Sequence, residues 1–153
     1  SDERTGGQVR CQTQTDAELM ITSEDIAILV RSTLTTACTD LTVSWQRHGY
    51  EKTNEVVIVP HMATGEGSIR TCIVKVNIHV PDIYDTANGC YETDFPTIKS
   101  IRDRVVNALK HHEEGTIGTN WRIESLAPPI KEPQYNEHFA SVNIEAFVRE
   151  RNN

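Results

Sequence analysis

The chain has 153 residues, 37% of them hydrophobic, and a formal net charge of −7. Its length predicts one domain, and its acidic balance argues against a surface that follows nucleic-acid phosphates, which is normally basic. No apolar run approaches the roughly 18–20 residues that cross a bilayer, and no apolar block near the N-terminus indicates an export signal. We therefore expect a soluble protein that makes no membrane contact.

The first part of the chain predicts a polar arm followed by a helix. Residues 1–18 are rich in Thr, Gln and Gly and have almost no apolar anchor, so we expect a flexible arm there and one domain over 19–153. A helix is predicted from Thr22 or Ser23, either of which can cap it, to about 38–40, with acidic residues in its first turn.

Alternating apolar residues predict strands in the next part of the chain. Residues 41–48 and 55–60 read as two strands close enough to form a hairpin. Residues 71–80 alternate most regularly, with Cys72, Val74 and Val76 on one side, and Pro81 should end the pairing because it has no N–H to donate. This segment is the predicted central strand.

A long connection separates the central strand from a second helix. Residues 82–94 show no periodicity, and loops this long in compact domains are often functional or part of an interface. A helix is predicted from about Asp94, a capping residue, to about His112.

The remaining segments complete the predicted fold. Residues 120–126 and 139–150 read as strands, and the second of these matches the central strand closely enough to pair with it. The predicted fold class is α+β, with an antiparallel or mixed sheet of about five strands packed against two helices on one face, in the order αβββαββ.

Scattered cysteines and histidines give no metal or redox signature. The four cysteines contain no CxxC pair, and the six histidines show no HxH or HExxH spacing. Adjacent His111 and His112 would point about 100° apart on a helix. We expect structural thiols, with a disulfide as the smaller alternative, solvent-facing or hydrogen-bonded imidazoles, no metal site and no cofactor.

Acidic residues gather around the long connection, where Asp82, Asp85, Glu92 and Asp94 all lie. They lack the calcium-loop ligand spacing, and a general acid would need an apolar pocket that a sequence cannot display. No nucleophile elbow is present, and the TGEG segment at 64–67 lacks the following lysine and the helix start of a phosphate loop. We expect a solvated or intersubunit loop and no catalytic site.

The order of elements and one phrase resemble a known family. VNIHVPD at 76–82, followed by a loop and the amphipathic segment 98–109, is similar to the central part of tail terminator, or tail-completion, proteins of tailed bacteriophages. The strand NWRIES at 120–125 also fits, and the resemblance covers about residues 22–150.

The resemblance implies a structural virion protein at the head–tail junction. Such proteins form a homohexameric ring that caps the head-proximal end of the tail tube, stops its polymerisation and receives the head connector or neck protein. DNA passes through the lumen without specific binding, which an acidic wall would suit.

Position in the chain then suggests which residues make interface contacts. The loops at 61–68 and 82–94 are the predicted contact segments, with aromatic anchors because aromatic residues often carry interface energy. The candidate interface residues are Tyr84, Tyr91, Phe95, Asp82, Asp85, His61, Glu66 and Arg70.

Three other readings remain open. The chain could be another neck or connector protein, a small hydrolase or nuclease that uses the acidic loop with His79, or a monomeric module that binds a partner at a sheet edge.

Overall fold

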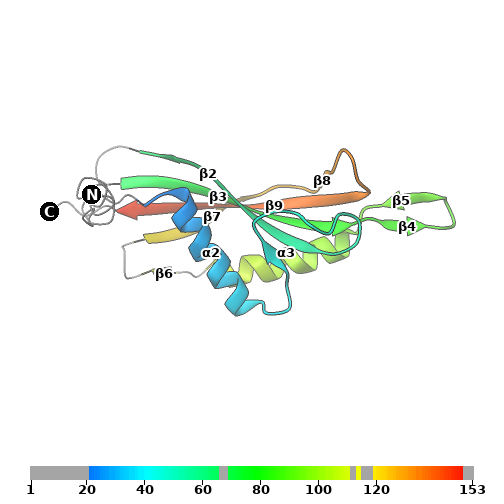
Figure 1. The fold of residues 1–153 in the computed structure, drawn as a ribbon, viewed down its shortest axis with the longest axis horizontal. Helices are drawn as coiled ribbons and strands as arrows, with labels where there is room; N and C mark the ends of the chain where they lie inside the picture. Colours follow the sequence, from blue (N-terminus) through cyan, green and yellow to red (C-terminus); the bar gives the residue numbers. More distant parts are fainter. Residues whose placement is uncertain (1–20, 66–68, 111–112, 115–118, 150–153) are drawn as a thin grey trace, which may run out of the picture.

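The computed structural model describes residues 21–65, 69–110, 113–114 and 119–149, which form an elongated α+β fold (Figure 1). The helices are α2 (Ser23–Ala37) and α3 (Phe95–Leu109). The strands are β1 (Val43–Ser44), β2 (Glu55–Thr64), β3 (Ile69–Pro81), β4 (Ile83–Asp85), β5 (Cys90–Glu92), β6 (Glu113–Glu114), β7 (Thr119–Leu126), β8 (Ile130–Lys131) and β9 (Glu137–Arg149).

In the described part of the chain, seven strands form one mixed sheet and two form a separate hairpin. The order in the sheet is β1-β2-β3-β9-β7-β6, with β8 also paired to β9. Only β1 runs parallel to its neighbour among the pairs described. The predicted α+β fold, with its mixed sheet and two helices, is confirmed.

The β3–β9 pair forms the centre of the sheet. These two strands of 13 residues pair antiparallel over their whole length, from Ile69 opposite Arg149 to Pro81 opposite Glu137. The predicted pairing of the two long strands is therefore confirmed, as is the end of the central strand at its proline.

The hydrophobic core lies between one face of the sheet and both helices. Alternate residues of β3 and β9 are buried on that face, and the helices cover them with Ile26, Val30, Leu34, Ile98, Val105 and Leu109. Each such side chain contributes about 1.5–3 kcal/mol when it is fully buried. Figure 1 shows both helices on the same side of the sheet.

Polar contacts set the helix starts that the sequence predicts. At α2, the backbone N–H and hydroxyl of Thr22 both donate to the carboxylate of Asp25, at 2.8 and 3.1 Å. At α3, Asp94 accepts from the backbone N–H of Thr97 at 3.2 Å, and a proline lies in the first turn. The helix ends at Leu109, whose carbonyl accepts from the indole N–H of Trp121 at 2.8 Å.

The predicted hairpin of 41–48 and 55–60 is wrong. Within 41–48, only Val43–Ser44 is a strand, and it pairs parallel with β2. Residues 45–54 form a loop instead, which places the side chain of Arg47 between the buried carboxylates of Glu55 and Glu137. Strand β2 also continues past Pro60 to Thr64, with a bulge between Pro60 and Ala63 that accommodates the missing N–H.

Two segments without a predicted strand contain short ones. Residues 82–94 hold the β4–β5 hairpin, and Ile130–Lys131 forms β8, with Ile130 opposite Phe139. Three-residue and two-residue strands are too short to show a period in sequence. The predicted N-terminal arm at 1–18 and the histidines at 111 and 112 lie outside the described residues.

Candidate functional site

The segment 82–94, which contains the β4–β5 hairpin, is called the arm from this point on. It is distinct from the predicted N-terminal arm at 1–18. It projects beyond one end of the long sheet (Figure 1), and β4 and β5 pair only with each other in the described part of the chain. The register places Ile83 opposite Glu92, Tyr84 opposite Tyr91, and Asp85 opposite Cys90.

A tight turn closes the tip of the arm. The carboxylate of Asp85 accepts from the backbone N–H groups of Ala87 and Asn88, at 2.9 and 3.3 Å, and from the side-chain amide of Asn88 at 2.6 Å. The Asn88 amide and these backbone donors lower the pKa of Asp85. Gly89 has a φ of 67°, which glycine adopts without strain.

Large apolar side chains of the arm are left uncovered. Tyr84 and Tyr91 are 50% and 49% exposed, and their rings meet edge to face with centroids 5.0 Å apart. Ile83 is 53% exposed, and Phe95, the first residue of α3, is 60% exposed. An isolated two-stranded hairpin is marginally stable in water at best. The arm is therefore the part of this protein that would gain most from a partner.

The base of the arm is fixed to β9. The side chain of Asp82 is 2% exposed, and its Oδ1 lies 2.7 Å from Nδ1 of His138. The backbone N–H of Asp82 donates to the carbonyl of Asn136 at 2.9 Å. Asp82 is thus a structural anchor rather than an exposed contact residue.

The ring of His138 also lies near the hydroxyl of Thr93, so Thr93, His138 and Asp82 form a chain of contacts. Oγ1 of Thr93 lies 3.1 Å from Nε2 of His138 and 3.4 Å from its Nδ1. An oxygen almost equally distant from both ring nitrogens lies off the lone-pair axis of each, so in-line proton transfer is disfavoured. The arrangement fits an anchoring contact better than an activated nucleophile.

A second polar cluster, the Arg47 cluster, holds the 45–54 loop on the face of the sheet that lacks helices. Arg47 donates through Nε and Nη2 to the carboxylate of Glu137 at 3.1 and 2.8 Å, and through Nη1 to Glu55 at 3.0 Å. Glu137 is fully buried, and its carboxylate also lies 3.2 Å from Nδ1 of His79. Glu55 accepts from the backbone N–H of His48 at 2.7 Å.

Electrostatics in the Arg47 cluster favours fixed charges. Burial alone would raise the pKa of Glu55, but the His48 N–H, the Ser44 hydroxyl, the His48 ring and Arg47 together lower it to about 2. Burial would also raise the pKa of Glu137, but the hydrogen bonds and charge of Arg47, together with the Glu51 N–H and the His79 ring, outweigh burial and lower that pKa. Burial lowers the pKa of His79. A carboxylate with a depressed pKa is a weak base and a poor acid near neutral pH, so the cluster is best read as structural.

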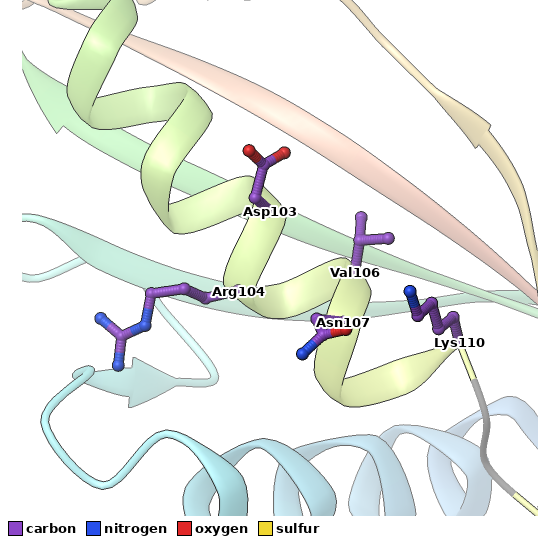
Figure 2. A pocket seen from close by; sticks show the side chains of 5 residues that line it. All are labelled: Asp103, Arg104, Val106, Asn107 and Lys110. Atoms are coloured by element: carbon purple, nitrogen blue, oxygen red, sulfur yellow. The ribbon is translucent and has the colours of Figure 1, made fainter.

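Depressions on the helix surface do not gather reactive groups. One of about 470 Å³ is lined by Asp103, Arg104, Val106, Asn107 and Lys110. Figure 2 shows that these side chains diverge from α3 instead of converging, and Arg104 is paired with Asp40. Among the described residues, no group of three or more His, Cys, Asp or Glu side chains could hold a metal ion.

The acids and the histidine of the hydrolase reading lie in separate settings. Asp82 binds His138, Asp94 caps α3, and His79 belongs to the Arg47 cluster. Asp85 closes the turn at the arm tip, and Glu92 is exposed on β5. The structure therefore does not bring the acidic loop and His79 together into a pocket.

The predicted interface residues fall at two ends of the molecule. Tyr84, Tyr91 and Asp85 lie on the arm, with Phe95 at its base. His61 is exposed at the β2 bulge, and Arg70 is half-buried near the start of β3, at the end of the sheet far from the arm (Figure 1). Glu66 lies outside the described residues.

Sequence reasoning missed the Arg47 cluster. Its two carboxylates are Glu55 and Glu137, and 90 positions separate Arg47 from Glu137. The available signal was a charged residue at the start of two strands, which by itself indicates solvent exposure as readily as a buried ion pair.

Comparison with protein-family models and with curated proteins finds no match for this sequence. No helix among the described residues has the length and apolar character needed to cross a membrane.

Proposed function

We propose that this protein is a structural virion component of a tailed phage, a tail terminator that caps the tail tube as a homohexameric ring. The ring stops polymerisation of the tube protein and presents the surface to which the head connector docks. The assignment to this family rests on the resemblance of residues 22–150, and the structure contributes a reason for self-assembly.

The observation that supports an assembly role is the exposed arm. It carries Tyr84 and Tyr91, each about half exposed, on a hairpin that no other described strand extends. Aromatic side chains concentrate at the energetic centres of interfaces, and a free hairpin of this size gains stability when it is covered. A structural, partner-dependent protein accounts for the arm without any catalytic step.

Charge and symmetry fit the ring. A heterologous contact closes into a ring when its rotation returns to the starting point, and a net charge of −7 suits a lumen that DNA crosses without being held. No cofactor is needed, and the assembled protein would reside in the virion at the head–tail junction after assembly in the host cytoplasm.

The alternative that the same observations allow is that the protein is another neck or connector component of the virion. A connector would use the arm to bind the next ring of the neck and would not stop tube growth. The two roles are separated by what the protein does to a growing tube.

The test combines oligomeric mass with tube growth. Native mass spectrometry of the full chain, with and without the tail-tube protein of the same virus, should give a species near six times 17.2 kDa in at least one condition. Electron microscopy should show tubes that stop growing when the protein is added. A hexamer that leaves tube growth unchanged would favour the connector role, and a monomer that ignores the tube protein would contradict both.

A further inference from the structure

We propose that the arm of one copy packs into a groove at the start of α3 of a second copy of this chain. The inference rests on the proposed ring and supplies its subunit contact. It follows from an exposed hairpin and from an apolar groove with cationic side chains, which lie on the same chain.

The acceptor surface is here called the α3 groove. It has a volume of about 240 Å³ and is lined by Phe95, Pro96, Ile98, Lys99, Arg102 and Pro129. Two exposed apolar residues, Leu126 and Ile130, lie close to Pro129 in the sequence, at 49% and 51% exposure. The groove therefore has an apolar floor and two cationic side chains.

The donor surface carries negative charge and no positive charge. Residues 82–94 contain neither lysine nor arginine; of their four carboxylates, Asp82 is buried against His138, Asp94 caps α3 and Asp85 closes the turn, so Glu92 is the carboxylate that is exposed for contact. Glu92 is exposed on β5 opposite Ile83, so these two side chains share the face of the hairpin that points away from Tyr84 and Tyr91. Lys99 of the groove makes an exposed pair with Asp103 at 2.7 Å. An exposed pair of this kind is worth little, about 0.2–1 kcal/mol, so Lys99 can exchange it for a carboxylate of an incoming arm.

A copy cannot fill its own groove in this arrangement. The arm points away from the body beyond the end of the sheet, and α3 starts at the base of the arm (Figure 1). The anchor between Asp82 and His138 holds that base against β9. An arm that keeps this direction must meet the groove of another molecule.

Symmetry explains why the contact would produce a ring. The arm and the groove are different patches, so their contact is heterologous, and each added copy leaves one free arm and one free groove. Ring closure fills all of them, and the apolar surface on the face of the arm that enters the groove is then removed from water in every copy.

Cross-linking tests this contact directly. Cys90 is a free, exposed thiol on β5, and Cys38 and Cys72 are buried. In a full-length Cys11→Ser background, Lys99→Cys should be joined to Cys90 of a neighbour by a short bismaleimide, giving covalent oligomers. The matched control is Arg122→Cys, an exposed site on the helix-free face, which should cross-link no more than the background protein.

A charge exchange supplies the second measurement. Glu92→Lys and Lys99→Glu should each weaken self-association about tenfold, equivalent to about 1.4 kcal/mol, and the double variant should recover most of the affinity. Native mass spectrometry and sedimentation of the full chain measure this.

The outcomes separate the contact from the proposed ring. Oligomers that form normally in both single variants, with Lys99→Cys no more reactive than Arg122→Cys, would overturn the arm-and-groove contact and leave the ring in place. A chain that is monomeric with and without tube protein would overturn both.

Discussion

Two segments at the same end of the sheet differ in how far their side chains are covered by the rest of the chain. The 45–54 loop is tied to the sheet by Arg47, whose guanidinium meets two buried carboxylates. The arm at 82–94 is tied only at its base, by Asp82 and His138, and its aromatic side chains stay exposed. The polar groups of the loop are paired within its own chain, whereas the arm keeps large apolar side chains exposed.

The difference lies in the chemistry each segment carries. The loop has an arginine that satisfies carboxylates of β2 and β9, so its polar groups are paired within one molecule. The arm has exposed tyrosines, and the only pairing of β4 and β5 among the described strands is with each other. Stability should therefore depend on the loop, and association on the arm.

The largest expected effect is on Arg47. Arg47→Ala removes one side of a buried ion pair and leaves Glu137 uncompensated, so we expect a loss of about 3–5 kcal/mol in the free energy of unfolding. Urea denaturation measures it. Arg122→Ala is the matched control, because Arg122 also pairs with a carboxylate, Glu145 at 2.6 Å, but is largely exposed. Its loss should stay below about 1 kcal/mol; equal losses would contradict the role of the cluster.

Acid should act through the same cluster. The pKa of Glu55 is about 2 in the folded protein against an ordinary value of 4.5, and that of Glu137 is also lowered. A depressed folded pKa gives stability that is present above the unfolded pKa and lost as the pH falls toward the folded pKa. The free energy of unfolding should therefore fall between about pH 5 and pH 2.

The variant Glu55→Gln sharpens the pH prediction. It should be less stable than the native protein near neutral pH and should lose less stability on acidification, because one titrating group is gone. Thermal melts at a series of pH values measure both. An unchanged pH dependence in Glu55→Gln would show that other groups govern acid unfolding.

The arm should show the reverse pattern. Tyr84→Ser combined with Tyr91→Ser should change the free energy of unfolding of the monomer by no more than about 0.5 kcal/mol, since both side chains are exposed. Self-association should be lost in native mass spectrometry.

A tyrosine of the loop is the matched control for the arm. Tyr50 stacks on Tyr135 with centroids 4.1 Å apart and lies beneath Arg47. Tyr50→Ala should cost about 1 kcal/mol or more of stability and leave association intact. Association that survives in the arm variant but fails in Tyr50→Ala would reverse the comparison.

The smallest effect is expected at the arm tip. Gly89→Ala places a Cβ on a residue with φ of 67°, which costs about 1 kcal/mol locally. Hydrogen exchange of the arm amides should speed up while the melting temperature of the body stays the same. Arm amides that exchange at the native rate would show that the turn tolerates the change.

Long, regular patterns were readable from the sequence. The alternation of 71–80 predicts β3, and the similar pattern of 139–150 predicts its partner, because two long strands with one buried face favour each other. Asp94 and Thr22 marked the helix starts through their capping chemistry.

Short or long-range features were not readable. The β4–β5 strands have three residues each, and the 41–48 alternation failed because Arg47 is drawn to Glu137, a residue far away in the sequence. Tyr84, Tyr91 and Phe95 could be proposed as contact residues from their type and position. Their exposure and the neighbouring groove required the three-dimensional structure.

Native mass spectrometry of the full chain beside its Tyr84→Ser, Tyr91→Ser variant, each with and without the tube protein, shows whether the arm drives assembly. A hexamer, six times 17.2 kDa, is expected for the native chain and a folded monomer for the variant. A native chain that remains monomeric in both conditions, or a variant that forms the same hexamer, would contradict this expectation.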